Sequence, residues 1–319
     1  MTALTLTLPT VSALITLSGT AKPLITQKML TFLNALEITE VTEKTIAGEI
    51  FLSVRTTSPV TEILTSTNFL NLQKFANHSA LKVDCVAVDS TEFRSINTRS
   101  FGKKRLLLLD VDSTLIQEEV IELLANKAGA GVEVARVTAA AMSGQLEFTA
   151  ALDARVKLLA GLPETVLAEV RKEITLTAGA RELILALQKL GHQVGIVSGG
   201  FIDVIEPLAK ELHIDFIRAN KLEIIDQKLT GRLEGTVIDR AGKAQALRDF
   251  ANIAGVDIAE TVAIGDGAND IDMLNIAGIG IAFNAKPILR SVADISLNSP
   301  HLDCALYLMG LSEAEIALI

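Results

Sequence analysis

The later part of the chain alternates between short apolar runs and stretches in which apolar residues recur at helical spacing. Leu106 to Leu109 are four large apolar residues in succession, bounded by polar residues on both sides. Such runs are typical of strands buried on both faces of a parallel sheet. Further strands are predicted at Gln193–Val197, Ile214–Ile217, Thr261–Ile264, Ile279–Phe283 and Ile295–Leu297, and helices at Ala180–Leu190, Phe201–Leu212 and Ala241–Ala254. This alternation predicts an α/β fold with a parallel sheet.

Two segments depart from the simple alternation. A hairpin is predicted across Leu222–Leu233, with polar Asp226 and Gln227 at its turn. Between about residues 117 and 178 only helical spacing occurs, so this segment is predicted to be an all-helical insert. Its helices are predicted at Glu118–Ala128, Val132–Met142, Leu146–Leu159 and Pro163–Glu173.

The N-terminal part of the chain has a different order of elements. Strands are predicted at Ser12–Leu17, Ile38–Thr42, Ile46–Val54 and Ala80–Val88, and helices at Pro23–Leu36 and Val60–Ala76. The order β-α-β-β-α-β is that of an α+β ferredoxin-like unit. This order, with Gly19 before the first helix, resembles the ACT-type regulatory domains.

The ACT-like resemblance implies a unit that binds an amino acid such as serine and pairs with a second copy into a homodimer. A dimerisation or stability module without a ligand is an equally good interpretation. The predicted boundaries are residues 1–92 for this ACT-like domain, 93–103 for a polar linker and 104–319 for the α/β domain.

Charge and composition narrow the class of partner. A net charge of −9 without a long basic stretch argues against nucleic acid. No apolar segment is long enough for a membrane helix, and the N-terminus lacks the basic start of a signal peptide. Cys85 and Cys304 lack metal-site spacing and are interpreted as buried thiols in a reducing compartment. We therefore expect a cytoplasmic protein that binds neither nucleic acid nor membrane.

Polar residues follow three of the predicted strands. They are Asp110 and Asp112 after the first, Ser198, Gly199 and Gly200 after the second, and Asp266, Asn269 and Asp270 after a third. Each set has a plainer interpretation, because Asp, Asn and Ser also cap helices and Ser-Gly-Gly also makes an ordinary turn. Ligands of open α/β sheets bind beyond the carboxyl ends of the strands, so three sets at one edge favour one shared site.

Carboxylates dominate this predicted site. Asp110, Asp112 and Asp266 have no His or Cys near them in sequence, and such oxygen ligands favour Mg²⁺ over zinc. Two carboxylates as close as Asp110 and Asp112 are tolerated when a cation lies between them or one holds a proton. One Asp can attack phosphorus while another donates a proton to the leaving oxygen. Lys243 suits a phosphoryl group, although it can equally be a solvated helix lysine. The residues favour Mg²⁺-dependent phosphoryl transfer.

Four segments, in this order, resemble the four motifs of the haloacid dehalogenase superfamily. They are Asp110-Val111-Asp112-Ser113-Thr114, Ser198-Gly199-Gly200, Lys243 and Gly265-Asp266-Gly267-Ala268-Asn269-Asp270. The resemblance implies a Rossmann-like core, with the helical insert as its cap. More narrowly, the chain from about Arg105 to Met309 resembles the phosphoserine phosphatases, through the cap residues Glu119, Met142, Phe148 and Arg155.

This resemblance implies a role for each motif residue. Asp110 is then the nucleophile and Asp112 the general acid/base. Mg²⁺ is held by Asp110, the backbone carbonyl of Asp112, and Asp266, with Asp270 in support. The implied substrate-binding residues are Glu119 for an ammonium, Arg155 for a carboxylate, Met142 and Phe148 as an apolar lid, Ser198, Gly199 and Lys243 for the phosphoryl group, and Asn269.

The implied reaction is hydrolysis of O-phospho-L-serine to L-serine and phosphate through an aspartyl-phosphate, the last step of serine biosynthesis. Two other functions stay open. One is a related phosphotransferase that passes the phosphoryl group to homoserine. The other is an amino-acid-binding regulatory protein whose α/β part is only a scaffold. The adjacent carboxylates argue against the scaffold, since a binding module has no use for charges that repel each other.

Overall fold

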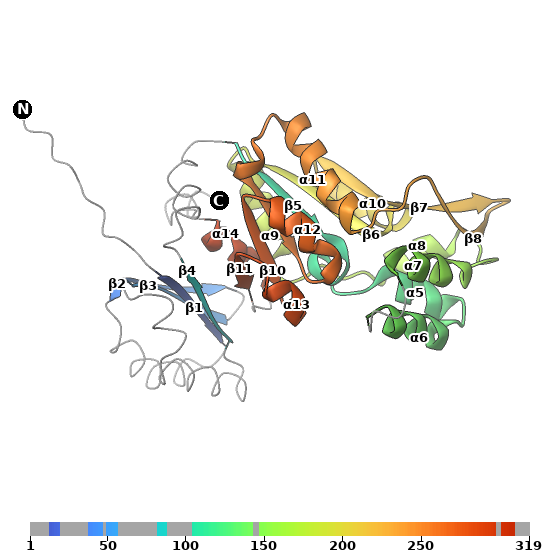
Figure 1. Cartoon of the computed structure of the whole chain (residues 1–319), viewed down its shortest axis with the longest axis horizontal. Coiled ribbons are helices and arrows are strands. Elements are labelled where there is room, and N and C mark those ends of the chain that lie inside the picture. The colour runs from blue at the N-terminus through green and yellow to red at the C-terminus, as the bar shows by residue number, and fades with distance from the viewer. Residues whose placement is uncertain are drawn as a thin grey trace, which may run out of the picture. The chain divides into compact units, whose positions relative to one another are not determined.

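The computed structural model describes residues 13–19, 38–46, 49–56, 82–87, 104–142, 147–297 and 301–309 (Figure 1). The chain divides into two compact units, Met1–Phe101 with Ser296–Ser299 and Gly102–Ile295 with Pro300–Ile319. Two separate sheets are formed, one of four strands and one of seven.

The four-stranded sheet lies in the N-terminal unit and has the order β2-β3-β1-β4. Its strands are β1 (Ala13–Gly19), β2 (Ile38–Ile46), β3 (Glu49–Thr56) and β4 (Lys82–Ala87), and β1 pairs antiparallel with both β3 and β4. These strands confirm the four predicted from the sequence. The two predicted helices and the predicted linker lie outside the described residues.

The seven-stranded sheet has the order β11-β10-β9-β5-β6-β7-β8. Its strands are β5 (Leu106–Asp110), β6 (Gln193–Phe201), β7 (Phe216–Ile225), β8 (Lys228–Glu234), β9 (Thr261–Gly265), β10 (Ile279–Phe283) and β11 (Ile295–Leu297). The pairs from β10 to β7 are parallel, and β8 joins β7 antiparallel. The parallel α/β core predicted from the sequence is therefore present.

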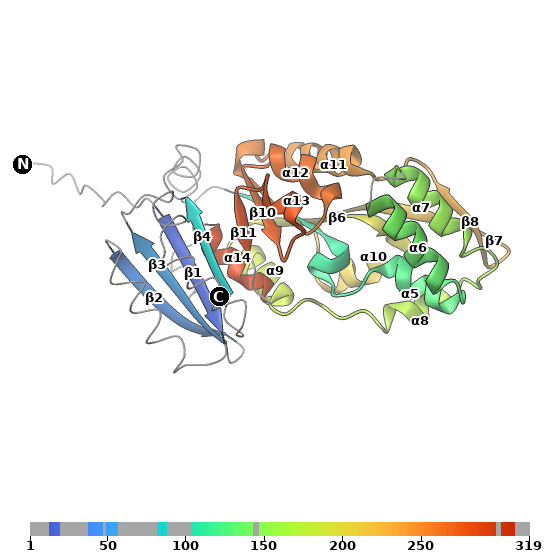
Figure 2. The same ribbon diagram turned by 60° about the horizontal axis from the view of Figure 1, so that its bottom comes forward.

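Helices cover both faces of the central strands, which is why β5, β9 and β10 are buried along their whole length. Leu106 and Leu108 of β5 pack in one cluster with Leu247 of α11 (Arg240–Ala254) and Leu274 of α12 (Ile271–Ile276). Figure 2 shows α11 and α12 on one side of the sheet and α9 (Ala180–Lys189) and α10 (Ile202–Glu211) on the other. Since successive side chains alternate across a strand, a run of leucines fills both interfaces.

The helical insert is present as predicted. It contains α5 (Val120–Lys127), α6 (Gly131–Met142), α7 (Phe148–Lys157) and α8 (Val166–Arg171), which Figure 1 shows as one group beside the β7–β8 hairpin. We refer to these four helices as the cap. Short helices α13 (Pro287–Arg290) and α14 (Ala305–Leu308) complete the unit.

Two local features differ from the sequence predictions. The strand predicted to end at Val197 continues to Phe201, with an irregularity in its pairing to β7 between Ser198 and Phe201. The predicted strand Ile214–Ile217 and the first arm of the hairpin are one continuous strand, β7. The hairpin turn itself is confirmed, since Asp226 and Gln227 both have positive φ (50° and 59°), as a tight hairpin turn requires.

Among the described residues, no helix is both long enough and apolar enough to span a bilayer.

Candidate active site

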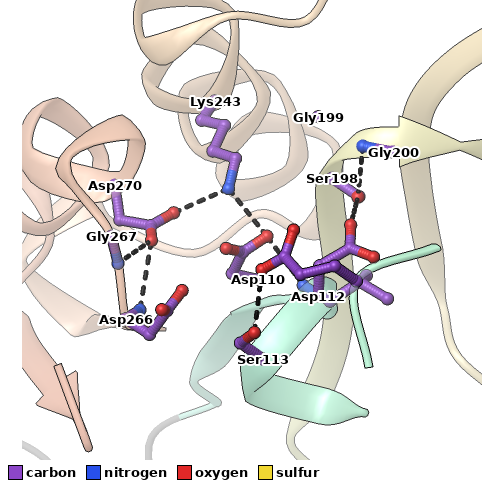
Figure 3. Close-up of polar contacts among 12 residues, drawn as sticks. Asp110, Asp112, Ser113, Ser198, Gly199, Gly200, Lys243, Asp266, Gly267 and Asp270 are labelled. Carbon is purple, nitrogen blue, oxygen red and sulfur yellow. Dashed lines mark hydrogen bonds and ion pairs between the residues drawn. The ribbon is translucent and has the colours of Figure 1, made fainter. Parts of the chain in front are cut away.

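The candidate site lies where three neighbouring strands end. β5 lies between β9 and β6 in the sheet, so their carboxyl ends meet at one edge. Strands β6 to β8 follow on one side of β5, and β9 to β11 then follow on its other side. Such a reversal of strand order opens a ligand crevice in an α/β sheet. Figure 3 shows Asp110, Asp112, Ser198, Lys243, Asp266 and Asp270 around this edge.

Lys243 is the central cation of the site. It lies in the first turns of α11, is fully buried, and its Nζ is 2.7 Å from Asp110 Oδ1 and 2.7 Å from Asp270 Oδ1. Burial alone would lower the pKa of Lys243, but Asp110 and Asp270 outweigh it and hold the pKa above its usual value. Lys243 is therefore a charged, buried residue, and its interpretation as a solvated helix lysine is wrong.

The loop after β9 brings two more carboxylates to Asp110. Asp270 Oδ2 accepts hydrogen bonds from the backbone N–H groups of Asp266 at 3.2 Å and Gly267 at 3.0 Å. Burial, then the charge of Asp270, raises the pKa of Asp110 well above its usual value and that of Asp266 to about 7. One oxygen from each of Asp110, Asp266 and Asp270 lies within 4.8 Å of the others.

This cluster fits a divalent metal ion. Lys243 pairs with Asp110 and Asp270, and Lys286 acts on Asp266, so carboxylates outnumber the nearby ammonium groups. Burial, and then the charge of Asp270, raises the pKa of Asp110 and of Asp266. All the clustered donors are carboxylate oxygens, which hard cations prefer.

Asp112 points away from this cluster and toward the cap. Its Oδ1 accepts a hydrogen bond from the Val120 N–H at 2.8 Å, and its Oδ2 accepts one from Ser198 Oγ at 2.9 Å. Burial, then the charge of Glu119, raises the pKa of Asp112 to about 6. Asp112 is thus held between β6 and the first turn of α5 with a pKa close to neutrality, as suits proton transfer.

The two glycines after Ser198 permit close approaches. A Cβ on Gly200 would lie 2.6 Å from Asp112 Oδ2, and a Cβ on Gly199 would lie 3.1 Å from Cζ of Phe148. The Gly200 N–H donates to Ser198 Oγ at 2.7 Å. The segment is therefore part of a bulged strand and lies before the helix, since α10 begins only at Ile202. The helix predicted to begin at Phe201 is confirmed to within one residue, with Phe201 as its N-cap.

Two charged cap residues lie near Asp112. Glu119 Oε1 accepts a hydrogen bond from Ser113 Oγ at 2.8 Å, and Ser113 holds a left-handed conformation at φ 56°. Burial lowers the pKa of the Arg155 guanidinium, while the charges of Glu119 and Asp112 oppose that effect. Glu119, directly before α5, and Arg155 of α7 are therefore both linked electrostatically to Asp112.

The remaining predicted residues are placed as follows. Met142 is the last residue of α6. Asn269 lies in the loop after β9, where a Cβ on Gly267 would be 2.4 Å from its Oδ1. Asn220, a buried amide in β7 that contacts Gly199, was not predicted. No local signal marks it, because β7 also contains the charged residues Arg218, Lys221 and Glu223.

Comparison with known proteins agrees with the motifs. The model of the haloacid dehalogenase-like hydrolase family matches residues 107–275, more than half of the chain. A phosphoserine phosphatase of Streptomyces coelicolor is 58% identical over 213 residues, which cover 67% of this chain and 52% of that protein. The chain thus spans about half the length of this curated relative.

Solved structures are similar in the same way. One, described as a phospho-aspartyl intermediate analogue of phosphoserine phosphatase, is 43% identical with a TM-score of 0.62, over 65% of this chain and 99% of that one. A probable phosphoserine phosphatase from Vibrio cholerae is 29% identical with a TM-score of 0.75, over 97% of this chain and 89% of that one. The chain belongs to the haloacid dehalogenase-like hydrolase family.

Proposed function

We propose that this protein is a phosphoserine phosphatase that hydrolyses O-phospho-L-serine to L-serine and phosphate. The observation that supports the proposal is electrostatic: the charge of Glu119 acts on Asp112, and the charges of Glu119 and Asp112 both act on Arg155. An amino-acid phosphate needs an anion for its ammonium and a cation for its carboxylate, close to the reacting phosphoryl group. Similarity to phosphoserine phosphatases, at 58% identity in the Streptomyces coelicolor protein, supports the same substrate.

The reaction proceeds in two displacements at phosphorus. A carboxylate oxygen of Asp110 attacks phosphorus and the bond to the serine oxygen breaks, while Asp112 gives its proton to that leaving oxygen. Asp112 then takes a proton from water, whose oxygen attacks the phosphorus of the aspartyl-phosphate. Phosphate leaves and the carboxylate of Asp110 is regenerated. The pKa of about 6 lets Asp112 serve as acid and then as base near neutral pH.

The phosphoryl group is bound by Ser198, the backbone of Gly199, and Lys243. Asp110, the backbone carbonyl of Asp112, and Asp266 would hold Mg²⁺, with Asp270 in support, and the ion would supply positive charge that offsets the phosphate. Phe148, with Met142, excludes water above this site, which strengthens the charge interactions inside it. Asn269 completes the substrate site.

Steady phosphate release is the first test. Purified protein with Mg²⁺ should release phosphate from O-phospho-L-serine faster than from other phosphate esters, and without an acceptor alcohol. If the phosphoryl group is recovered as phosphohomoserine when homoserine is added, the protein is better assigned as a phosphotransferase. If no phosphate is released under any condition, the scaffold interpretation holds.

Arg155→Ala tests substrate recognition. Loss of a charge-assisted pair to the substrate carboxylate should lower kcat/KM for O-phosphoserine roughly 10- to 100-fold. O-phosphoethanolamine has the ammonium but no carboxylate, so its kcat/KM should change little. Lys157→Ala on the same helix is the matched control, since Lys157 is exposed and pairs with Asp153 on the surface. Equal losses on both substrates would remove Arg155 from carboxylate recognition.

Magnesium should stabilise the protein as well as activate it. Because carboxylates outnumber ammonium groups at the cluster, Mg²⁺ at about 100 times its Kd should add roughly 2.7 kcal/mol to the free energy of unfolding. The thermal midpoint measured with Mg²⁺, against sodium chloride of equal ionic strength, checks this. Asp266→Asn should weaken the shift; an equal midpoint in both salts for the wild type contradicts the metal assignment.

Further proposals concern the whole chain. We propose residues 1–92 as an ACT-like domain, 93–103 as a linker and 104–319 as the phosphatase domain. The ACT-like domain is proposed to bind serine and to form a homodimer. The proposed location of the protein is the cytoplasm. Light scattering on the full chain gives the oligomeric state directly, and a monomer contradicts the homodimer. Titrating serine into the full chain and into a chain that starts near Ser100 tests whether residues 1–92 bind serine. Equal responses of the two proteins to serine contradict that assignment.

A further inference from the structure

The Ser198-Gly199-Gly200 segment leaves the regular pairing of the sheet. Ser198 of β6 pairs with Ala219 of β7, and the next pair is Phe201 with Asn220. Two residues of β6 are thus inserted where β7 has none, which is a bulge. Bulges re-aim side chains next to active sites, but the inserted peptides lose the ladder bonds that would orient them.

Asn220 supplies a replacement for those ladder bonds. Its side chain is buried, with Nδ2 donating to the Gly199 carbonyl oxygen at 2.8 Å and Oδ1 accepting from the Ile238 N–H at 2.7 Å. Ile238 directly precedes Asp239, which caps α11 through the Gly242 N–H at 2.8 Å. One amide therefore joins the bulge of β6 to the start of the helix that carries Lys243.

The bond to Gly199 acts on the reacting groups through a single peptide plane. The Gly199 carbonyl and the Gly200 N–H belong to the same planar peptide, so fixing one orients the other. That N–H donates to Ser198 Oγ at 2.7 Å, and Ser198 Oγ donates to Asp112 Oδ2 at 2.9 Å. A continuous path of hydrogen bonds thus runs from Asn220 to Asp112.

We propose that Asn220 is a positioning residue, which orients the Gly199–Gly200 peptide and through it the Ser198 hydroxyl for phosphoryl binding. The proposal rests on the proposed function and deepens it. Asn220 touches no reacting atom, so its effect is on geometry. It should affect every phosphate ester alike, because it acts on the phosphoryl end of the site and leaves Glu119 and Arg155 unchanged.

Asn220→Asp separates positioning from general packing. The substitution is nearly isosteric and keeps an acceptor for the Ile238 N–H, but an ionised carboxylate cannot donate to the Gly199 carbonyl. We expect the inhibition constant for inorganic phosphate to rise about tenfold or more, and kcat to fall on O-phosphoserine and O-phosphoethanolamine to the same extent. L-Serine binding and the Mg²⁺-induced shift of the thermal midpoint should stay at wild-type values.

Thr261→Val is the matched control for lost stability. Thr261 is equally buried at the opposite end of the sheet, where its Oγ1 donates to the Ile258 carbonyl at 2.6 Å and accepts from the Gly278 N–H at 3.3 Å. It should lower the thermal midpoint without changing phosphate affinity. If Asn220→Asp does not fold, Asn220→Ser removes the long-range bonds without a buried charge and carries the same expectation.

Two results overturn the proposal. One is wild-type phosphate affinity and kcat in a folded Asn220 variant. The other is an equal loss of phosphate affinity in Thr261→Val at a comparable thermal midpoint. Calorimetry with inorganic phosphate measures affinity without turnover. If the wild-type protein fails to hydrolyse phosphoserine, the proposed substrate is wrong. The phosphate affinities of the wild type and the Asn220 variants then still decide the role of Asn220.

Discussion

Asp110→Asn should abolish turnover and, without metal, raise the stability of the protein. An amide oxygen does not attack phosphorus, so kcat on O-phosphoserine should fall at least ~10³-fold. The fold should persist, because Asn keeps the size of Asp and an oxygen that can accept from the Val111 N–H, which lies 2.7 Å from Asp110 Oδ1.

The gain in stability follows from the same electrostatics. The pKa of Asp110 is raised in the folded protein, first by burial and then by Asp270, so the charged carboxylate opposes folding at every pH above its unfolded pKa. A neutral amide removes that cost and leaves Lys243 paired with Asp270. A gain of about 1 kcal/mol would raise the thermal midpoint by about 2–4 °C in a domain of this size.

Phosphate release with Mg²⁺ and thermal unfolding without divalent ions measure the two effects. Asp153→Asn serves as the control, because Asp153 is exposed on the cap and should leave both quantities unchanged. Near-normal turnover of Asp110→Asn would mean that another group is the nucleophile. A lower midpoint would mean that the Asp110 charge stabilises the apo protein.

Strands and cap were predictable because their patterns are local. Leu106 to Leu109 are buried on both faces of β5, and a continuous apolar run of that length between polar residues has few other interpretations. The hairpin turn at Asp226 and Gln227 was equally readable, since Asp tolerates the left-handed conformation that the turn requires. Such features depend on neighbours within a few residues.

The internal contacts of the site were not predictable in this way. Periodicity does not reveal that Ser198 donates to Asp112, or that Asn220 holds the Gly199 carbonyl, because these pairs are 86 and 21 residues apart in the chain. The bulge in β6 also escaped the pattern, since apolar residues and glycines continue through it. Motif resemblance named Lys243 as a phosphoryl ligand, but only the structure places it between two buried carboxylates.

Lys243→Met should be the most destabilising single change at the site. Lys243 is fully buried with Asp110 and Asp270 each 2.7 Å from its Nζ, and methionine of similar length leaves both carboxylates without that cation. Removing one partner from a buried ionic cluster costs about 3–5 kcal/mol. Turnover should also be lost, since the phosphoryl group loses a positive charge.

A double variant separates the charge effect from packing. Asp270→Asn neutralises one of the carboxylates that Lys243→Met leaves without a cation. The double variant should therefore lose less unfolding free energy than the sum of the losses in the two single variants. Contacting residues in one network commonly show coupling of about 0.5–3 kcal/mol. Denaturant unfolding of the four proteins closes this cycle. Lys210→Met, which removes an exposed lysine paired with Glu206, should change stability by less than about 0.5 kcal/mol.

The response to Mg²⁺ is an independent measure of the repulsion among the clustered carboxylates. Without Lys243 the three carboxylates lose their buried ammonium partner, so the Mg²⁺-induced rise in thermal midpoint should be larger in Lys243→Met than in the wild type. A smaller rise, together with additive effects in the double variant, would show that Lys243 acts through packing and that charge crowding does not govern this edge of the sheet.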